Sequence, residues 1–269
     1  MENKAFSIMD LPPENPKIPL KLDTEIYKLG RKSQYDIPKY MNPEMAYLAG
    51  ALRDGAISKT GTQIGTKYYI AFCNSSYEWL QSVIKPILEK LFRININAPF
   101  EDRKSTKYQI RIRKHGIVIF LSDLFEHPFG KQTEWETPNW ILDAPEEIRK
   151  WYLRGFFDSE GGCGNVVKQM EKYPWQSVFY IGFYGSSLGE KCQVLEDLKI
   201  ILKDFEISYE PIKRDNFERR NSYKSKSNAF FFKITHFEDK IKFIERIGSS
   251  HPEKLNNLIT LSKMIAAQS

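Results

Sequence analysis

The sequence has few of the features that mark secreted, disulfide-stabilised or membrane proteins. Its three cysteines, Cys73, Cys163 and Cys192, are an odd number at no metal-like spacing. This argues against a disulfide framework or a zinc site and favours a reducing compartment. The chain also lacks a run of about 18 apolar residues and a charged-then-apolar N-terminal leader. We therefore expect an intracellular protein, in the cytoplasm or an organelle, that is not secreted and has no membrane partner.

The charge balance and the length narrow the choice further. The chain has 269 residues, 41% of them hydrophobic, which is enough for one large domain or two small ones with a real core. Lys and Arg number 40 against 34 Asp and Glu, which gives a formal net charge of +6. This excess favours a polyanionic partner, although a basic balance alone does not establish one.

The order of predicted elements occurs twice along the chain. Residues 1–42 are rich in proline and charge and are predicted to form an N-terminal arm, whose apolar residues need cover from the rest of the protein. Residues 43–142 then follow the pattern helix, two strands, helix, two strands, helix, and residues 143–269 repeat it. A repeat of about 100 residues indicates duplicated α+β halves rather than a solenoid.

Local signals place the ends of several helices. Asn42 is a suitable N-cap and Pro43 fits the first helical turn. Asp143 and Glu146 have the spacing of a capping box at the start of the second half. Within residues 77–92 the apolar spacing predicts a helix that Pro86 kinks or breaks.

One helix in each half is unusual because an apolar, small-residue helix ends in an acid followed by glycine. These segments read "YLAGALRDG", residues 47–55, and "LRGFFDSEG", residues 153–161. Small side chains at helical spacing allow two helix backbones to approach closely, and they are Ala46, Ala49 and Gly50 in the first helix and Gly155 and Ser159 in the second.

If the two helices pack along these small residues, their C-terminal ends emerge side by side. Asp54 and Glu160 then face each other, and two buried carboxylates repel unless a cation lies between them. Mg²⁺ suits such oxygen ligands and assists phosphodiester cleavage. Asp158 is turned about 200° from Glu160 around the helix axis, so we expect it to face solvent or to cap.

The two segments resemble the motifs of the LAGLIDADG homing endonucleases in their single-chain, two-motif form, and "TPNWI" and "IGSSHPEKLNNL" extend the resemblance. It implies two pseudo-symmetric αββαββα halves whose antiparallel sheets form a DNA-binding saddle. It also implies a metal site at Asp54 and Glu160, with Gly55 and Gly161 beside them, and catalysis by these two acids. By the same resemblance, Lys131 and Lys254 are weaker catalytic candidates that act on the transition state or the water network.

Basic and polar side chains on the predicted strands form the expected DNA interface. In "KYQIRIR", residues 107–113, long polar side chains alternate with apolar ones, and such a ribbon fits the major groove. The basic stretch 213–228 can hold flanking phosphates. The predicted DNA-binding residues are Lys59, Lys67, Arg103, Lys107, Gln109, Arg111, Arg113, Lys168, Tyr180, Lys213, Arg214, Arg219, Arg220, Lys224, Lys226 and Lys233.

The function predicted from the sequence is site-specific cleavage of double-stranded DNA with Mg²⁺, which Mn²⁺ or Ca²⁺ can replace in the site. Two similar halves in one chain favour a monomer with a long, partly asymmetric target. Met1 and the ending "MIAAQS" lack the residues of a splicing intein, so an intron-encoded or free-standing nuclease is expected. An RNA-splicing maturase or a DNA-binding regulator on the same scaffold stays open as an alternative.

Overall fold

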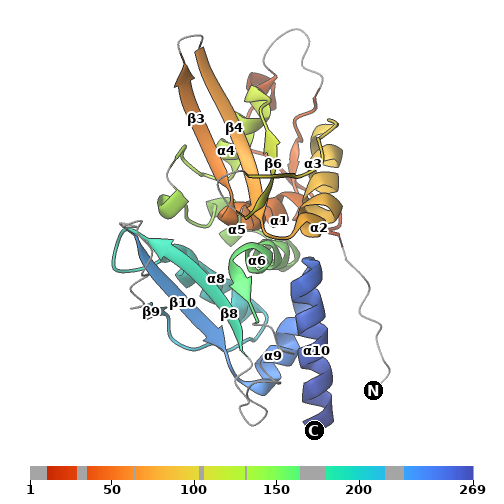
Figure 1. Cartoon of the computed structure of the whole chain (residues 1–269), viewed down its shortest axis with the longest axis vertical. Coiled ribbons are helices and arrows are strands. Elements are labelled where there is room, and N and C mark those ends of the chain that lie inside the picture. The colour runs from red at the N-terminus through yellow and green to blue at the C-terminus, as the bar shows by residue number, and fades with distance from the viewer. Residues whose placement is uncertain are drawn as a thin grey trace.

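The computed structural model describes residues 11–28, 35–62, 65–102, 106–130, 132–163, 180–215 and 227–268. Two α+β halves lie one above the other, and helices α1 and α6 pack between them (Figure 1). Within the described residues no helix is long and apolar enough to cross a bilayer.

The two halves contain the same elements in the same order. The first comprises α1 (Pro43–Ala51), η2 (Leu52–Asp54), β3 (Ala56–Thr62), β4 (Gly65–Asn74), α2 (Tyr77–Trp79), η3 (Leu80–Ile84), α3 (Lys85–Phe92), β5 (Phe100–Glu101), β6 (Tyr108–Ile112) and α4 (His115–Leu124). The connector contains η4 (Gln132–Glu134) and α5 (Asn139–Leu142). The second half comprises α6 (Glu146–Glu160), β7 (Gly161–Gly162), β8 (Ile181–Ser187), α8 (Gln193–Asp204), β9 (Lys213–Arg214), β10 (Asn228–Ile234), α9 (Phe237–Arg246) and α10 (Pro252–Gln268).

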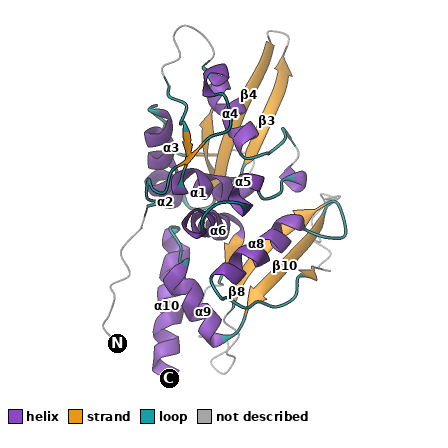
Figure 2. Cartoon of the chain, turned by 180° about the vertical axis from the view of Figure 1, so that it is seen from behind, coloured by secondary structure: helices purple, strands orange, loops and turns teal. Residues whose placement is uncertain are grey.

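Each half has one four-stranded antiparallel sheet, and the strand orders correspond. The first sheet is ordered β3-β4-β6-β5 and the second β7-β8-β10-β9. Helix α4 packs on the first sheet and α8 on the second, and both lie on the same side of the molecule (Figure 2). The other side of each sheet is called here its open face. The predicted α+β class with two pseudo-symmetric halves is confirmed.

The predicted packing of the two motif helices is confirmed as well. A Cβ at Gly50 would lie within 3.0 Å of backbone atoms of Tyr152 and Phe156, and one at Gly155 would do the same with Tyr47. The Ser159 hydroxyl donates to the Gly50 carbonyl at 3.0 Å across the interface. The two helices are therefore in backbone-to-backbone contact, and only glycine fits at their crossing.

Two of the local predictions need correction. Glu146 begins α6 after Pro145, which has no capping side chain, and Asp143 instead ends α5. No capping box forms there. Pro86 does not break the helix of residues 77–92, and the π-helical turn η3 that directly precedes it is the local distortion of this helix. The Asn42 cap is confirmed, since its side chain accepts from the Met45 amide at 3.0 Å.

The described part of the N-terminal arm packs on the first half. It contains β1 (Ile18–Pro19), η1 (Thr24–Tyr27) and β2 (Tyr40–Met41). Tyr27 is buried, and its hydroxyl donates to Asp123 of α4 at 2.9 Å. Of the arm's apolar residues, Tyr27, Ile37 and Met41 are buried, whereas Leu11 and Ile26 stay exposed, so the expected cover is partial.

The close helix crossing gives a first testable prediction. Gly155→Ala places a methyl group against the Tyr47 backbone, and overpacking of this kind costs about 3 kcal/mol of unfolding free energy. Urea unfolding measures the loss. Gly61→Ala is the matched control, because a Cβ at Gly61 meets nothing within 4 Å. Equal stability of the two variants would contradict the described helix contact.

Candidate active site

The two motif acids lie at equivalent places, each at the end of a helix and the beginning of a sheet. Asp54 ends η2 and leads through Gly55 into β3, whereas Glu160 ends α6 and leads directly into β7. Burial raises the pKa of both carboxyl groups. For Glu160 the negative charge of Asp54 adds to this effect, and the pKa rises to about 7. The acids therefore share one electrostatic environment, as the motif spacing predicted.

The surroundings of the two acids differ. The Lys107 ammonium forms an ion pair with Asp54 at 2.6 Å, whereas among the described residues no hydrogen bond reaches the Glu160 carboxylate. Burial opposes the charge on Lys107, but the hydrogen bond and charge of Asp54 outweigh it and raise the pKa of the lysine. Lys107, predicted from the sequence as a DNA contact, thus holds an acid of the site in this structure.

Lys254 is bound to the helix end that carries Glu160. Its ammonium donates to the backbone carbonyls of Phe157 and Asp158, both at 2.8 Å, and of Gly161 at 2.7 Å. These carbonyls lie at the C-terminal end of α6, where a cation also balances the helix dipole. The predicted role of Lys254 on the transition state or the water network stays a prediction. In the structure Lys254 holds the backbone around Glu160, including the carbonyl of Gly161, a residue predicted at the metal site.

The prediction for Asp158 was wrong. Its side chain is fully buried rather than solvent-facing. It accepts from the Tyr47 hydroxyl at 2.6 Å, from the Ser250 amide at 2.9 Å and from the Ser249 hydroxyl. The helix rotation was right, but the face opposite Glu160 is covered by α1 and by the segment before α10. Burial raises the pKa of Asp158, and these hydrogen bonds oppose the rise.

The buried network continues into the first half. The Trp79 indole donates to the Tyr47 hydroxyl at 2.8 Å, and the Trp79 ring lies 5.5 Å from that of His251. The His251 Nε2 lies 3.2 Å from the Asn74 amide oxygen, which also accepts from the Ser76 amide. An oxygen can only accept, so Nε2 carries the proton. Side chains of both halves are therefore joined behind the acids.

The predicted DNA-binding residues divide between the two faces of the sheets. Register and alternation place Lys67, Gln109, Arg111, Lys213 and Lys233 on the open faces, with Tyr180 and Arg113 continuing them. Lys59 pairs with Tyr68 and Arg214 with Phe230, so these two cations lie on the helix-facing side, at exposed positions. Gln109 is only 4% exposed, because Arg111 covers it.

Several predicted residues lie outside the described part of the chain. They are Arg103, Lys131, Lys168, Arg219, Arg220, Lys224 and Lys226. Their roles stay predictions.

The residues present at the site fit a hard divalent cation. Asp54 and Glu160 supply two carboxylates that repel each other, and the described residues hold no cluster of three or more Asp, Glu, His or Cys side chains that could bind a metal. A site with two acids leaves positions for water and phosphate oxygens, which is the usual way in which proteins bind Mg²⁺. Within the described part of the chain, Asp54 and Glu160 therefore remain the candidate ligands for such a cation.

Comparisons with known proteins agree with this architecture. No family model matches the chain. It is similar to homing endonuclease I-ApeI of Aeropyrum pernix, with 26% identity over 219 residues, 79% of this chain and 86% of the relative. The structure of I-DmoI in complex with DNA and Ca is similar with a TM-score of 0.55 and 15% identity, covering 81% of this chain and 97% of that one. The complex of I-DmoI with DNA and Mn gives a TM-score of 0.53 and 15% identity, over 77% and 96% of the two chains.

The fold and the site together define a two-motif protein in which paired helices bring one acid from each half to a shared centre. The close crossing of α1 and α6, the matching strand orders and the similarity to I-ApeI all fit this class. The resemblance to the single-chain LAGLIDADG homing endonucleases is thus supported by the similarity to I-ApeI and by the fold shared with I-DmoI.

The buried network predicts a dependence of stability on pH. Burial, aided by the charge of Lys254, lowers the pKa of His251 from its ordinary 6.5 to about 3. The folded protein keeps this side chain neutral, so the unfolded state gains a proton first as the pH falls below 6.5, and stability is lost. Between pH 7 and pH 5 the loss through this group is about 2 kcal/mol.

The measurement is urea unfolding at both pH values for the native chain and for His251→Gln, whose amide can still donate to Asn74. We expect the pH-dependent loss to be about 2 kcal/mol smaller in the variant. Both proteins contain the buried acids, whose raised pKa values make stability rise as the pH falls. Their contribution therefore cancels in the difference between the two pH profiles. An identical pH profile would show that His251 is not held neutral in the fold.

Proposed function

We propose that this protein is a site-specific endonuclease that hydrolyses one phosphodiester in each strand of double-stranded DNA, with a divalent cation held by Asp54 and Glu160. The observation that carries the proposal is the convergence of one acid from each half at the joint end of two helices in backbone contact. The relative I-ApeI, a homing endonuclease, and the DNA-bound and metal-bound structures of I-DmoI support it.

The chain's own groups have separate tasks in this reaction. A bound divalent cation supplies Lewis acidity for the attacking water and the leaving oxygen. Asp54 and Glu160 hold the cation, and Glu160 must lose its proton near pH 7 to do so. Lys254 fixes the backbone that carries Glu160. Arg53 is buried nearby, donates to the Trp135 carbonyl at 2.6 Å and favours the charged form of Glu160.

The open faces of the two sheets supply the DNA-binding saddle. They lie on one side of the molecule, away from α4 and α8, and carry lysine and arginine at regular strand spacing (Figure 1). Antiparallel strands with long donors fit the major groove on either side of the acids. Two different halves in one chain permit an asymmetric target and cleavage by a monomer acting inside the cell.

The test is a cleavage selection on randomised duplexes with Mg²⁺, followed by single substitutions. Asp54→Asn and Glu160→Gln are each expected to slow cleavage of the selected site on the order of a hundredfold or more, because loss of one ligand removes several kcal/mol of transition-state stabilisation. Binding in Ca²⁺ at fixed salt should persist. Glu245→Gln, an exposed acid on α9, is the control.

Tight binding by the native chain without any cut would contradict the proposal. It would favour the maturase or the regulator on the same scaffold.

The ion pair of Lys107 with Asp54 gives a further prediction. Lys107 occupies the carboxylate that the cation needs, so Lys107→Met should bind Ca²⁺ or Mn²⁺ about fivefold more tightly in the absence of DNA, since an ion pair of this exposure is worth about 1 kcal/mol. Titration calorimetry at pH 7.5 measures the change. Lys67→Met removes the same charge from the open face of β4 without touching Asp54. Equal affinity in the two variants would show that Lys107 does not compete with the cation.

A further inference from the structure

The strand register defines which residues of the two sheets correspond. In the first sheet Ala56, two residues after Asp54, pairs with Ala71, and Ala71 pairs in turn with Arg111. These three residues form a row across β3, β4 and β6 on the open face. Arg111 is therefore the cation of this row, which begins two residues after Asp54.

The second sheet contains the same row. Gly162, two residues after Glu160, pairs with Gly182, and Gly182 pairs with Lys233. Lys233 therefore corresponds to Arg111, and each cation is followed by a buried isoleucine, Ile234 or Ile112. Arg111 lies over the ring of Tyr69, and Lys233 lies over the ring of Tyr180. Each tyrosine precedes the middle residue of its row by two positions.

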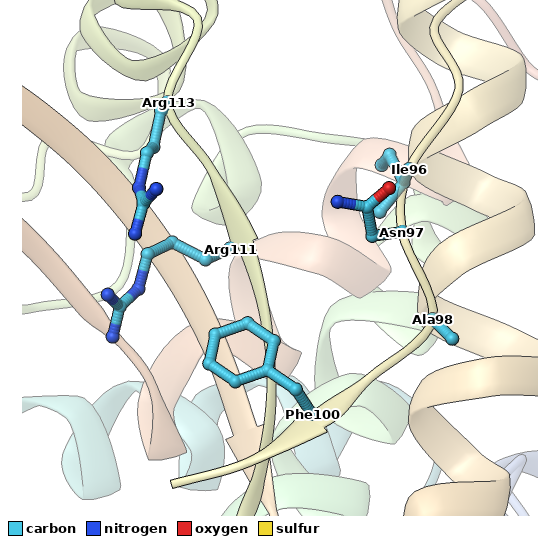
Figure 3. A pocket seen from close by; sticks show the side chains of 6 residues that line it. All are labelled: Ile96, Asn97, Ala98, Phe100, Arg111 and Arg113. Atoms are coloured by element: carbon cyan, nitrogen blue, oxygen red, sulfur yellow. The ribbon is translucent and has the colours of Figure 1, made fainter.

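The guanidinium of Arg111 is held from three sides. It lies 4.6 Å from the Tyr69 ring and 5.6 Å from the Phe100 ring. Its Nη2 donates to the amide oxygen of the buried Gln109 at 2.7 Å. Figure 3 shows Arg111 beside Phe100, with Arg113 on the same side of the strand. A planar donor fork in a fixed orientation suits the two acceptors of guanine, O6 and N7.

The surroundings of Lys233 are aromatic instead. Its ammonium lies 3.8 Å from the Tyr180 ring and 5.4 Å from the Phe231 ring. Phe231 corresponds by register to Gln109, and its partner Tyr184 corresponds to Cys73. The rings of Phe231 and Tyr184 lie 6.3 Å apart, and Tyr184 is 38% exposed. The second sheet therefore presents two aromatic rings where the first has the buried Gln109 and the partly buried Cys73.

An exposed apolar surface between lysines has one obvious complement in the major groove. Thymine carries the only methyl group on a base edge there, and apolar side chains read it by contact. Lys233 and Lys213 flank the rings and can hold the phosphates on either side. Unpaired bases also stack on aromatic rings, and the experiment below distinguishes them from thymine methyl groups.

We propose that the two sheets read different base classes at corresponding positions. Arg111, oriented by Gln109, Tyr69 and Phe100, reads a guanine in one half-site. Phe231 and Tyr184 read thymine methyl groups in the other half-site. This inference rests on the proposed function, because it names the sequence classes that the same DNA-binding surface selects.

The experiment uses the full chain and the duplex recovered by the cleavage selection. Thymines are replaced by uracil in one half-site at a time, which removes only the methyl groups, and affinity is measured in Ca²⁺ at fixed salt. We expect a loss of about fourfold for each contacted methyl in one half-site and little change in the other. Replacement of guanine by 7-deazaguanine should lower affinity about tenfold in the opposite half-site, because N7 is lost.

Matched variants assign the effects to side chains. Phe231→Ser and Tyr184→Ser should each weaken binding and reduce the difference between thymine and uracil. Arg111→Lys keeps the charge and should abolish the sensitivity to 7-deazaguanine. Phe237→Ser removes an exposed aromatic ring from α9, away from both open faces, and should leave every difference unchanged. Thermal unfolding of each variant separates a binding defect from a loss of fold.

The possible outcomes separate this inference from the proposed function. If no duplex is cut, the endonuclease proposal fails. If the duplex is cut but uracil has no effect in either half-site, or the effect persists in both serine variants, the reading of thymine by the second sheet is overturned. Preferred binding of single strands over the duplex by the native chain would assign the aromatic face to base stacking instead.

Discussion

The contact between Gly50 of α1 and Gly155 of α6 is the constraint on which the rest of the structure depends. Each glycine faces backbone atoms of the other helix, so the two axes are closer than any larger side chain permits. Because a helix is rigid over these lengths, the crossing fixes where both helices end. The acids stand at those ends, and the first strand of each sheet begins there. One packing contact thus sets the distance between the acids and the relation between the sheets.

This arrangement brings charged groups into a poorly hydrated region, and the chain offsets the loss of water with specific partners. Asp158 is satisfied by Tyr47 and by the segment before α10. Lys254 satisfies the carbonyls at the end of α6. No hydrogen bond from a described residue reaches the Glu160 carboxylate, and burial together with the charge of Asp54 raises its pKa to about 7. A buried acid that lies beside a second acid is the place where a bound cation lowers the free energy most.

The sequence predicted what depends on local spacing. The small residues at the crossing, the acid at each helix end and the twofold order of elements all follow from periodicity within one segment. Asp158 shows where this reasoning ends, because a helical wheel gives the direction of a side chain but not the element that covers it. The partners Ser249 and Ser250 lie about 90 positions further along the chain. The ion pair of Lys107 with Asp54 was missed for the same reason, since it depends on how β6 is registered against β4.

The strand register shows how the corresponding residues of the two sheets differ. Gln109 and Phe231 occupy the same place next to the cation, although one is an amide and the other an aromatic ring. A homodimer must place the same residue at both positions, and its target is then symmetric. Fusion of the halves in one chain removes that requirement. The interface of α1 and α6 must stay conserved in shape within this molecule, because both acids depend on it, whereas the open faces can differ freely. The structure therefore separates what is common to the two halves, the helix contact and the acids, from what can specify an asymmetric DNA sequence.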